Sequence, residues 1–189
     1  MKKYSIKDTN LMTWEEVDEL IEILLSKIES HKEKITVVAP LLRTGGIIGG
    51  ILSIKMRLQT MLPVQFKYSY NPTKINQILA VPDILTSIPE PMNVLLCEGN
   101  TSTGRIAINA AKVIKEKYPQ AKIFLATLVK VYGCPETLSG IEHVFYARMT
   151  DEHFKATAEE KAKLNLREGV TIFPWENAGD EISDMNATS

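Results

Sequence analysis

The segment from residue 93 to residue 129 constrains the fold most, because it predicts a strand, a loop, a helix and a second strand in direct succession. NVLLC (93–97) and AKIFLATLV (121–129) are continuous apolar runs, and residues 104–118 between them place apolar side chains at helical spacing. Continuous apolar strands are typical of parallel sheets that are buried on both faces. We therefore expect a parallel pair of strands joined by a helical crossover.

The preceding residues repeat this order of elements. Thr13 and Glu16 form a capping box ahead of apolar residues at helical spacing, which predicts a helix over 13–30. A strand, a glycine-rich turn, a crossover helix and another strand are then expected at 35–40, 43–46, 47–59 and 64–70. Weaker strand patterns at 143–147 and 170–173 flank a charged helical stretch. The alternation predicts an α/β fold with a doubly wound, mainly parallel sheet, whose ligand lies at the carboxyl ends of the strands.

Two segments depart from this regular pattern. Residues 71–91 are polar and contain several prolines, so we expect a long flexible loop that carries a short strand or hairpin. Residues 178–189 are polar and acidic, which predicts a disordered tail. Residues 1–177 are then expected to form a single domain.

The balance of charged residues limits the classes of molecule that the protein is expected to bind. Lys and Arg total 22 and Asp and Glu total 23, so no positive field favours nucleic acid or an anionic membrane, and small-molecule substrates are expected instead. The N-terminus lacks the apolar stretch of a signal peptide and no run is long enough to span a bilayer, which predicts a cytoplasmic protein. No metal-ligand spacing relates the cysteines or histidines, and no role is expected for Cys97, Cys134, His31, His143 or His153.

The loop after Cys97 is the first candidate binding site. Its residues Thr101, Ser102, Thr103, Gly104 and Arg105 combine hydroxyl groups, a flexible glycine and a helix N-terminus, which together attract a phosphate monoester. The alternative is that the hydroxyl groups only cap the helix. Glu98, at the end of the strand, is placed to accept ribose hydroxyl groups or to reach Mg²⁺, and otherwise is a solvated loop acid.

The glycine-rich turn is the second candidate. Arg43, Thr44, Gly45 and Gly46 let the backbone turn its amides into a concave anion site with a charged clamp, and pyrophosphate is a suitable guest. A dinucleotide-binding turn is the competing interpretation. It lacks support, because the next strand ends in KYSY without an acid to hold an adenosine ribose.

In this order of strand, acid, hydroxyl-rich loop, glycine and helix, VLLCEGNTSTGRIA resembles the phosphoribosyl diphosphate signature of type I phosphoribosyltransferases. TWEEVDELIEILLSKI and VVAPLLRTGGIIGGIL resemble the first helix, first strand and pyrophosphate loop of the purine enzymes of that family. The sequence Tyr68-Ser69-Tyr70-Asn71 is similar to the entrance of the flexible catalytic loop in hypoxanthine-guanine enzymes. Lys130 and residues 173–176 are similar to base-binding elements of xanthine-guanine relatives, so the resemblance covers residues 13–176.

The resemblance implies a fold with a flexible loop and a small C-terminal hood, and transfer of ribose 5-phosphate from phosphoribosyl diphosphate to a purine-like base, as in purine salvage. It implies a catalytic set of Glu98, Ser102, Ser69 and Tyr70. It implies a 5′-phosphate site of Thr101, Ser102, Thr103, Gly104 and Arg105, a pyrophosphate site of Arg43, Thr44, Gly45 and Gly46, and a base site of Lys130, Val170, Thr171, Ile172 and Trp175. Mg²⁺ would be held by Glu98 and Glu176, and the protein would be a homodimer or homotetramer.

Four positions depart from the family pattern. Gly99 replaces the second acid of the signature, Ser102 replaces an aspartate, Thr44 replaces a basic residue and Val170 replaces an aromatic residue. Two hypotheses follow: an active purine-type transferase, or a catalytically weakened or inactive protein that binds a nucleotide or phosphoribosyl diphosphate in a regulatory or interaction role. For a weakened transferase, Gly99→Asp is expected to restore an acid and raise the affinity for phosphoribosyl diphosphate.

Overall fold

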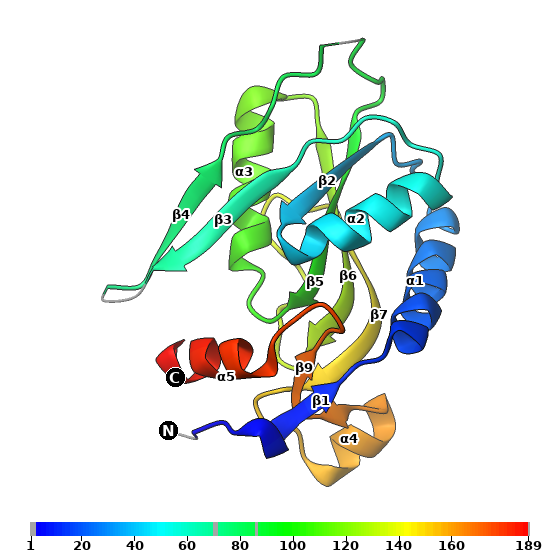
Figure 1. Ribbon diagram of the computed structural model, residues 1–189. Coiled ribbons are helices and arrows are strands. Elements are labelled where there is room, and N and C mark those ends of the chain that lie inside the picture. Colours follow the sequence, from blue (N-terminus) through cyan, green and yellow to red (C-terminus); the bar gives the residue numbers. More distant parts are fainter. Residues whose placement is uncertain (1–2, 70–71, 86, 189) are drawn as a thin grey trace.

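The computed structural model describes residues 3–69, 72–85 and 87–188 and has a central sheet with helices on both faces (Figure 1). The sheet has seven strands in the order β4-β3-β2-β5-β6-β7-β8. These strands are β2 (Val37–Leu42), β3 (Val64–Ser69), β4 (Lys74–Leu79), β5 (Asn93–Thr101), β6 (Lys122–Val131), β7 (His143–Asp151) and β8 (Arg167–Glu168). All neighbouring pairs are parallel except β3 and β4, which confirms the expected α/β fold with a mainly parallel sheet.

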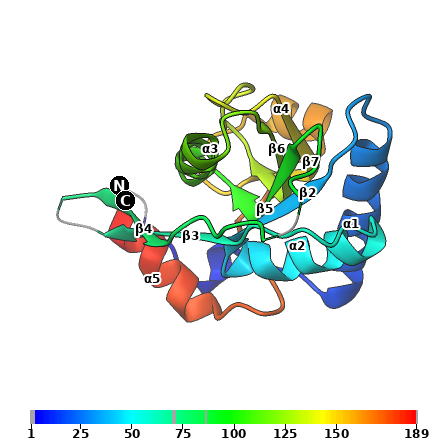
Figure 2. The ribbon, with the colours of Figure 1, turned by 90° about the horizontal axis from the view of Figure 1, so that it is seen from above.

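The helices cover the two faces of the sheet unequally. Figure 2 shows α3 on one side and α1 and α2 on the other. The helical segments are η1 (Ile6–Asp8, a 3-10 turn), α1 (Trp14–Glu29), α2 (Thr44–Lys55), α3 (Arg105–Lys117), α4 (Ala158–Leu164) and α5 (Ala178–Thr188). Two hydrophobic clusters, one on each face, exclude water from both sides of the central strands, which is why those strands are apolar throughout.

The start of α1 agrees with the sequence analysis. Thr13 is the N-cap, its hydroxyl accepts the Glu16 amide at 3.2 Å, and the Thr13 amide donates to the Glu16 carboxylate at 3.1 Å. The residues of α1 that pack on the sheet are Val17, Leu20, Ile21, Leu24 and Ile28. Burial of this apolar stripe fixes the helix on the sheet.

A smaller two-stranded sheet lies beyond the carboxyl ends of β5, β6 and β7 (Figure 1). It consists of β1 (Thr9–Leu11) and β9 (Val170–Ile172), which are parallel and pair Asn10 with Thr171. The expected strand at 170–173 therefore joins this small sheet, which we call the hood, instead of the main sheet.

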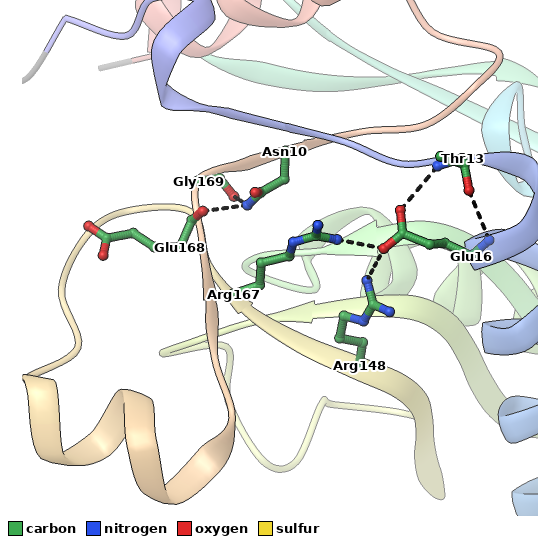
Figure 3. Close-up of polar contacts among 7 residues, drawn as sticks. All are labelled: Asn10, Thr13, Glu16, Arg148, Arg167, Glu168 and Gly169. Carbon is green, nitrogen blue, oxygen red and sulfur yellow. Dashed lines mark hydrogen bonds and ion pairs between the residues drawn. The ribbon is translucent and has the colours of Figure 1, made fainter.

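Glu16 connects α1 to the strands beneath the hood (Figure 3). One oxygen of its carboxylate accepts Arg167 at 2.6 Å and Arg148 at 3.3 Å, while the other caps the helix. On the far side of the hood, the Asn10 amide donates to the backbone carbonyl groups of Glu168 and Gly169. These contacts set the position of β8 and β9 relative to α1.

The strand β5 is longer than expected. Residues 98–101 were expected to be loop, but they continue the ladder with β6, where Glu98 pairs with Thr127 and Asn100 with Val129. The partner strand extends to Val131 and offers hydrogen bonds that a sequence pattern does not reveal. Two polar side chains, Glu98 and Asn100, are consequently held on a rigid strand.

Residues 178–188, which lie in the segment expected to be a disordered tail, form helix α5. The Asn177 side chain accepts the Gly179 amide at 2.8 Å at the start of the helix. Near its end, the Asn186 side chain accepts the backbone amide of Tyr4 at 2.8 Å and donates to its carbonyl group at 3.1 Å. These contacts join α5 to the N-terminal segment.

The segment expected to be a flexible loop contains β4, which forms an antiparallel hairpin with β3.

Over the ranges that the structure describes, no helix has the length and apolar character needed to cross a bilayer.

Candidate functional site

A cavity of about 310 Å³ lies where the ends of β2 and β5 meet the hood and α5. Segments far apart in the sequence contribute to it. Its lining comprises Leu41, Leu42, Arg43, Thr44, Gly45, Phe66, Glu98, Gly99, Asn100, Ile106, Glu152, Val170, Thr171, Phe173, Glu176, Glu181 and Met185. This is the edge of a parallel sheet at which ligands bind in doubly wound folds.

The β2–α2 turn forms one wall. Arg43, Thr44 and Gly45 line the cavity, and the Gly46 amide donates to the Arg43 carbonyl group at 2.8 Å. A Cβ atom at Gly45 would lie 2.0 Å from the carbonyl oxygen of Cys97, so only glycine lets α2 approach β5 this closely. The turn expected to hold pyrophosphate thus faces the cavity, although its binding role stays a prediction.

Glu98 also lines the cavity. Its carboxylate accepts the Thr101 hydroxyl at 2.7 Å. Burial raises the pKa of Glu98 to about 7, against the lowering effect of that hydrogen bond. A carboxyl group with this pKa exchanges its proton near neutral pH, and it can accept a ribose hydroxyl group in its ionised form.

The loop before α3 lies beside the cavity. Thr101 is buried, Thr103 and Arg105 are exposed, and Gly104 is the N-cap of α3 with a left-handed φ of 69°. Residues 101–105 are not part of the cavity lining, which continues at Ile106. The first turn of α3 nevertheless presents its amides next to the cavity, where an extended ligand would reach them.

His153 is a neighbour of this loop that the sequence analysis missed. Its Nε2 atom lies 3.0 Å from the Ser102 hydroxyl, and its Nδ1 atom lies 3.5 Å from the Tyr4 hydroxyl. Burial and then Lys155 lower the pKa of His153, while Asp151 acts in the opposite direction. The sequence pattern ended the preceding strand at residue 147, whereas β7 extends to Asp151, so no local signal marked His153.

Glu152 was missed for the same reason. It follows β7, is only 3% exposed, and lines the cavity. Its Oε1 atom accepts the Asn100 side-chain amide at 2.7 Å and the Thr171 backbone amide at 3.0 Å. Burial raises the pKa of Glu152, and the hydrogen bonds from Thr171, Asn100 and Thr150 oppose this rise.

The expected base-binding residues are divided among several places. Val170 and Thr171 line the cavity, whereas the buried Ile172 does not. The ring of Trp175 stacks on Phe173 with centroids 5.0 Å apart and lines a neighbouring cavity.

Lys130, the expected donor to the base, does not line this cavity. It is 1% exposed, lies 3.0 Å from the Glu136 carboxylate and faces the ring of Tyr146. It lines a different cavity, of about 490 Å³, along the edge of β7. Lys130 therefore lines a different cavity from Glu98. The strand register nevertheless pairs Lys130 with Thr101, whose hydroxyl group donates to Glu98, and the base-binding role of Lys130 stays a prediction.

Glu176 reaches the cavity from the end of the hood. Its two oxygen atoms accept the Thr44 hydroxyl at 3.1 Å and the Phe173 amide at 3.0 Å. Burial raises its pKa. Within the described residues no group of three metal-ligating side chains occurs, so Glu98 and Glu176 fit Mg²⁺ only as single carboxylates that share the ion with ligand phosphate oxygens.

Glu181 places an acidic group of α5 at the same cavity. Burial and then the carboxylates of Glu176 and Asp184 raise its pKa to about 7, while Arg43 opposes the rise. The cavity therefore contains four glutamates and a single arginine in its lining, namely Glu98, Glu152, Glu176, Glu181 and Arg43. Arg43 faces protein carboxylates where a ligand anion was expected.

Gly99, where the family signature has a second acid, is closely surrounded by side chains. A Cβ atom at Gly99 would lie 2.5 Å from Cγ2 of Thr44 and 3.0 Å from Cε2 of Phe173. An aspartate here would force the side chains of Thr44 and Phe173 to move, so the packing does not support the expectation that Gly99→Asp restores a ligand contact.

Ser69, another expected catalytic residue, is not part of the cavity lining. The Ser69 hydroxyl accepts the Asn76 side-chain amide at 2.9 Å on the β3–β4 hairpin. Tyr70 lies outside the described residues. The catalytic set therefore stays a prediction.

The fold is that of the type I phosphoribosyltransferases. Neither protein-family models nor curated protein sequences match this chain. The likeness rests on solved structures, each of which is less than 20% identical to the chain.

Three of these structures cover nearly the whole chain. A purine phosphoribosyltransferase from Pyrococcus horikoshii has a TM-score of 0.64 and 19% identity, covering 90% of this chain and 95% of its own. The xanthine-guanine-hypoxanthine phosphoribosyltransferase of Helicobacter pylori has a TM-score of 0.61 and 15% identity, covering 93% and 99%. A hypothetical protein from Neisseria gonorrhoeae with bound ppGpp has a TM-score of 0.67 and 15% identity, covering 98% and 99%.

Proposed function

We propose that this protein is a phosphoribosyltransferase that transfers ribose 5-phosphate from phosphoribosyl diphosphate to a purine-like base and releases pyrophosphate. One observation carries the proposal: Arg43, Glu98 and Thr171, from three distant segments, line one cavity at the carboxyl ends of the strands. The phosphoribosyltransferase fold supports the same class of enzyme.

Each part of the substrate has a suitable environment. The β2–α2 turn offers Arg43 and backbone amides to the pyrophosphate group, and Glu98 offers its carboxylate to ribose hydroxyl groups. The start of α3, with Ser102 and Thr103, suits the 5′-phosphate. Val170 and Thr171 of the hood would cover the base.

The chemistry is displacement of pyrophosphate from the anomeric carbon by a ring nitrogen of the base, through a state with oxocarbenium character. The protein contributes chiefly by holding the reactants in position and by neutralising the leaving group with Arg43. Mg²⁺, when held by Glu98 or Glu176 together with the diphosphate, supplies further neutralisation. His153 is the neutral imidazole placed to accept a proton near Ser102.

A second candidate function is nucleotide binding without turnover. It is favoured by the likeness to the Neisseria gonorrhoeae protein with bound ppGpp, and by the serine at position 102 where the catalytic family has an aspartate. In this version, phosphates would occupy the β2–α2 turn and the start of α3, and ppGpp is the first ligand to test.

A cytoplasmic location and assembly into a homodimer or homotetramer belong to the same proposal. Light scattering coupled to size exclusion measures the oligomeric state directly.

The test measures pyrophosphate release with Mg²⁺, phosphoribosyl diphosphate and a panel of purine bases, alongside calorimetric binding of phosphoribosyl diphosphate and ppGpp. Arg43→Gln should weaken binding of either ligand by about 10-fold or more, because a charge-assisted contact is lost. Arg57→Gln is the matched control, since Arg57 is exposed at the other end of α2. Binding without pyrophosphate release would favour the second candidate, and no binding at all would reject both.

A further inference from the structure

We propose that α5 is a displaceable acidic cover over Arg43, and that a ligand carrying a diphosphate group binds by moving this helix aside. The inference rests on the proposed function and adds a regulatory contact to its pyrophosphate site. The C-terminal helix is then a competitor of the ligand that the chain itself supplies.

The acidic residues of α5 meet Arg43 in three neighbouring cavities. Arg43 lines cavities of about 310, 320 and 450 Å³. Glu181 lines the first, Asp180 and Glu181 line the second, and Asp184 lines the third. Among the described residues, Arg43 is the only basic one that lines the first two cavities. The helix therefore presents carboxylates to the residue expected to bind a ligand anion.

The charges on α5 make its docking sensitive to a competing anion. The helix has three acidic residues, Asp180, Glu181 and Asp184, and no basic one. At Glu181, the like charges of Glu176, Asp184 and Asp180 oppose the attraction of Arg43. A diphosphate group carries more negative charge than one carboxylate and can bond a guanidinium group through two oxygen atoms, so it is the stronger competitor for Arg43.

Little apolar packing holds α5 in place. From Ala178 to Ala187 none of its residues is fully buried, whereas α1 buries five residues and α3 buries four. Burial of an apolar face provides most of the free energy that docks a helix on a protein. We therefore place α5 among the segments that open at a low cost in free energy.

Polar contacts hold the two ends of α5 differently. Just before the helix, the Glu176 carboxylate accepts the Thr44 hydroxyl at 3.1 Å and ties the chain to the β2–α2 turn. At the far end, which lies beside the N-terminal segment (Figure 1), Asn186 makes two exposed hydrogen bonds to the backbone of Tyr4. Water replaces exposed hydrogen bonds at little net cost. The far end is thus the one that detaches, and residues 177–179 serve as the pivot.

A docked cover lowers the apparent affinity for a ligand by a definite factor. The apparent affinity equals the intrinsic affinity multiplied by the fraction of molecules in which the helix is open. Weaker docking raises that fraction and therefore raises the apparent affinity. Ribose 5-phosphate lacks the diphosphate group that would compete for Arg43, so it should leave the helix in place.

The experiment is hydrogen exchange of the full chain, measured by mass spectrometry with Mg²⁺ and either inorganic pyrophosphate or ribose 5-phosphate at the same concentration. Pyrophosphate should make the amides of α5 exchange about 10-fold faster or more, while those of α1 stay protected. Ribose 5-phosphate should leave exchange in α5 unchanged. Unchanged or slower exchange in α5, at a concentration where calorimetry shows that pyrophosphate is bound, would overturn the inference.

A variant tests the contact that holds the far end. Asn186→Ala removes both hydrogen bonds to Tyr4 and should raise the affinity for pyrophosphate by about 3- to 10-fold. Ser183→Ala, at an exposed position of the same helix, is the control and should bind pyrophosphate as the wild type does. Equal affinities of Asn186→Ala and the wild type would contradict the cover. The exchange experiment uses the wild-type chain, so the inference stays testable if Asn186→Ala does not fold.

The outcomes separate this inference from the proposed function. Exchange in α5 that does not respond to bound pyrophosphate, together with turnover of phosphoribosyl diphosphate and a base, would overturn the cover and leave the transferase standing. Faster exchange without turnover of any base would support the cover and reject the transferase. If pyrophosphate does not bind, both fail.

Discussion

The Ser102 hydroxyl lies 3.0 Å from Nε2 of His153, and this contact ties the loop before α3 to the loop after β7. The second loop is itself fixed, because the Asp151 carboxylate accepts the backbone amides of Lys155 and Ala156 at 2.9 Å each. A histidine is thereby positioned beside the residue that departs from the family pattern. The arrangement makes His153 a candidate for the proton transfer that serine does not support.

The first prediction concerns His153→Gln. The lowered pKa keeps the imidazole neutral at pH 8, and a bound 5′-phosphate would raise that pKa, so wild-type affinity for phosphoribosyl diphosphate should increase as the pH falls from 8 to 6. In the variant, this increase in affinity should be smaller than in the wild type by a factor of about 3 to 10, as measured by calorimetry at both pH values. Identical pH profiles for variant and wild type would show that the imidazole does not contact the phosphate.

The second prediction follows from Glu98. Its folded-state pKa of about 7 lies above the ordinary value of 4.5, so its protonated form stabilises the fold below pH 4.5 and this contribution is lost as the pH rises through 7. Thermal unfolding should therefore show lower stability at pH 8 than at pH 5, by ~1 to 3 kcal/mol. Glu98→Gln should flatten this dependence, whereas the exposed Glu116→Gln should not.

The third prediction reverses an expectation drawn from the signature. Gly99→Ala and Gly99→Asp should both destabilise the protein, by about 1 to 3 kcal/mol for overpacking, because any Cβ atom meets Thr44 and Phe173. They should also weaken binding of phosphoribosyl diphosphate, since Thr44 belongs to the β2–α2 turn. Gly50→Ala is the control: its Cβ atom would meet nothing within 4 Å in the middle of α2, and it should stabilise the helix by about 0.5 to 1 kcal/mol. Tighter binding by Gly99→Asp would contradict the packing argument.

The fourth prediction concerns Glu181 on α5. Its carboxylate competes with a ligand anion for Arg43, so Glu181→Gln should raise the affinity for phosphoribosyl diphosphate by about 3- to 10-fold at pH 8. At pH 6 the effect should shrink, because the wild-type residue, with a pKa of about 7, is already largely protonated there. Calorimetry at the two pH values measures the gain in affinity at pH 8 and the smaller gain at pH 6. An equal gain at both pH values would attribute the effect to packing instead of charge.

The sequence by itself determined the elements and the class of fold. The capping box of Thr13, the apolar runs of the central strands and the glycine-rich turn are local patterns, and local hydrogen bonding and side-chain periodicity decide them. They also placed Arg43 and Glu98 at the edge of the sheet where the structure has its cavity, whereas Thr171 was expected there only from the family resemblance.

Only the tertiary structure decided which other groups meet there. Glu152 and His153 approach Asn100 and Ser102 because β7 extends to Asp151 beside β6, a register that no local pattern encodes. The same dependence on distant contacts ordered α5 against the N-terminal segment and turned Lys130 toward Glu136. Side-chain spacing along the chain reports on one element at a time, whereas a binding site at a parallel sheet's edge is assembled from residues that only folding brings together.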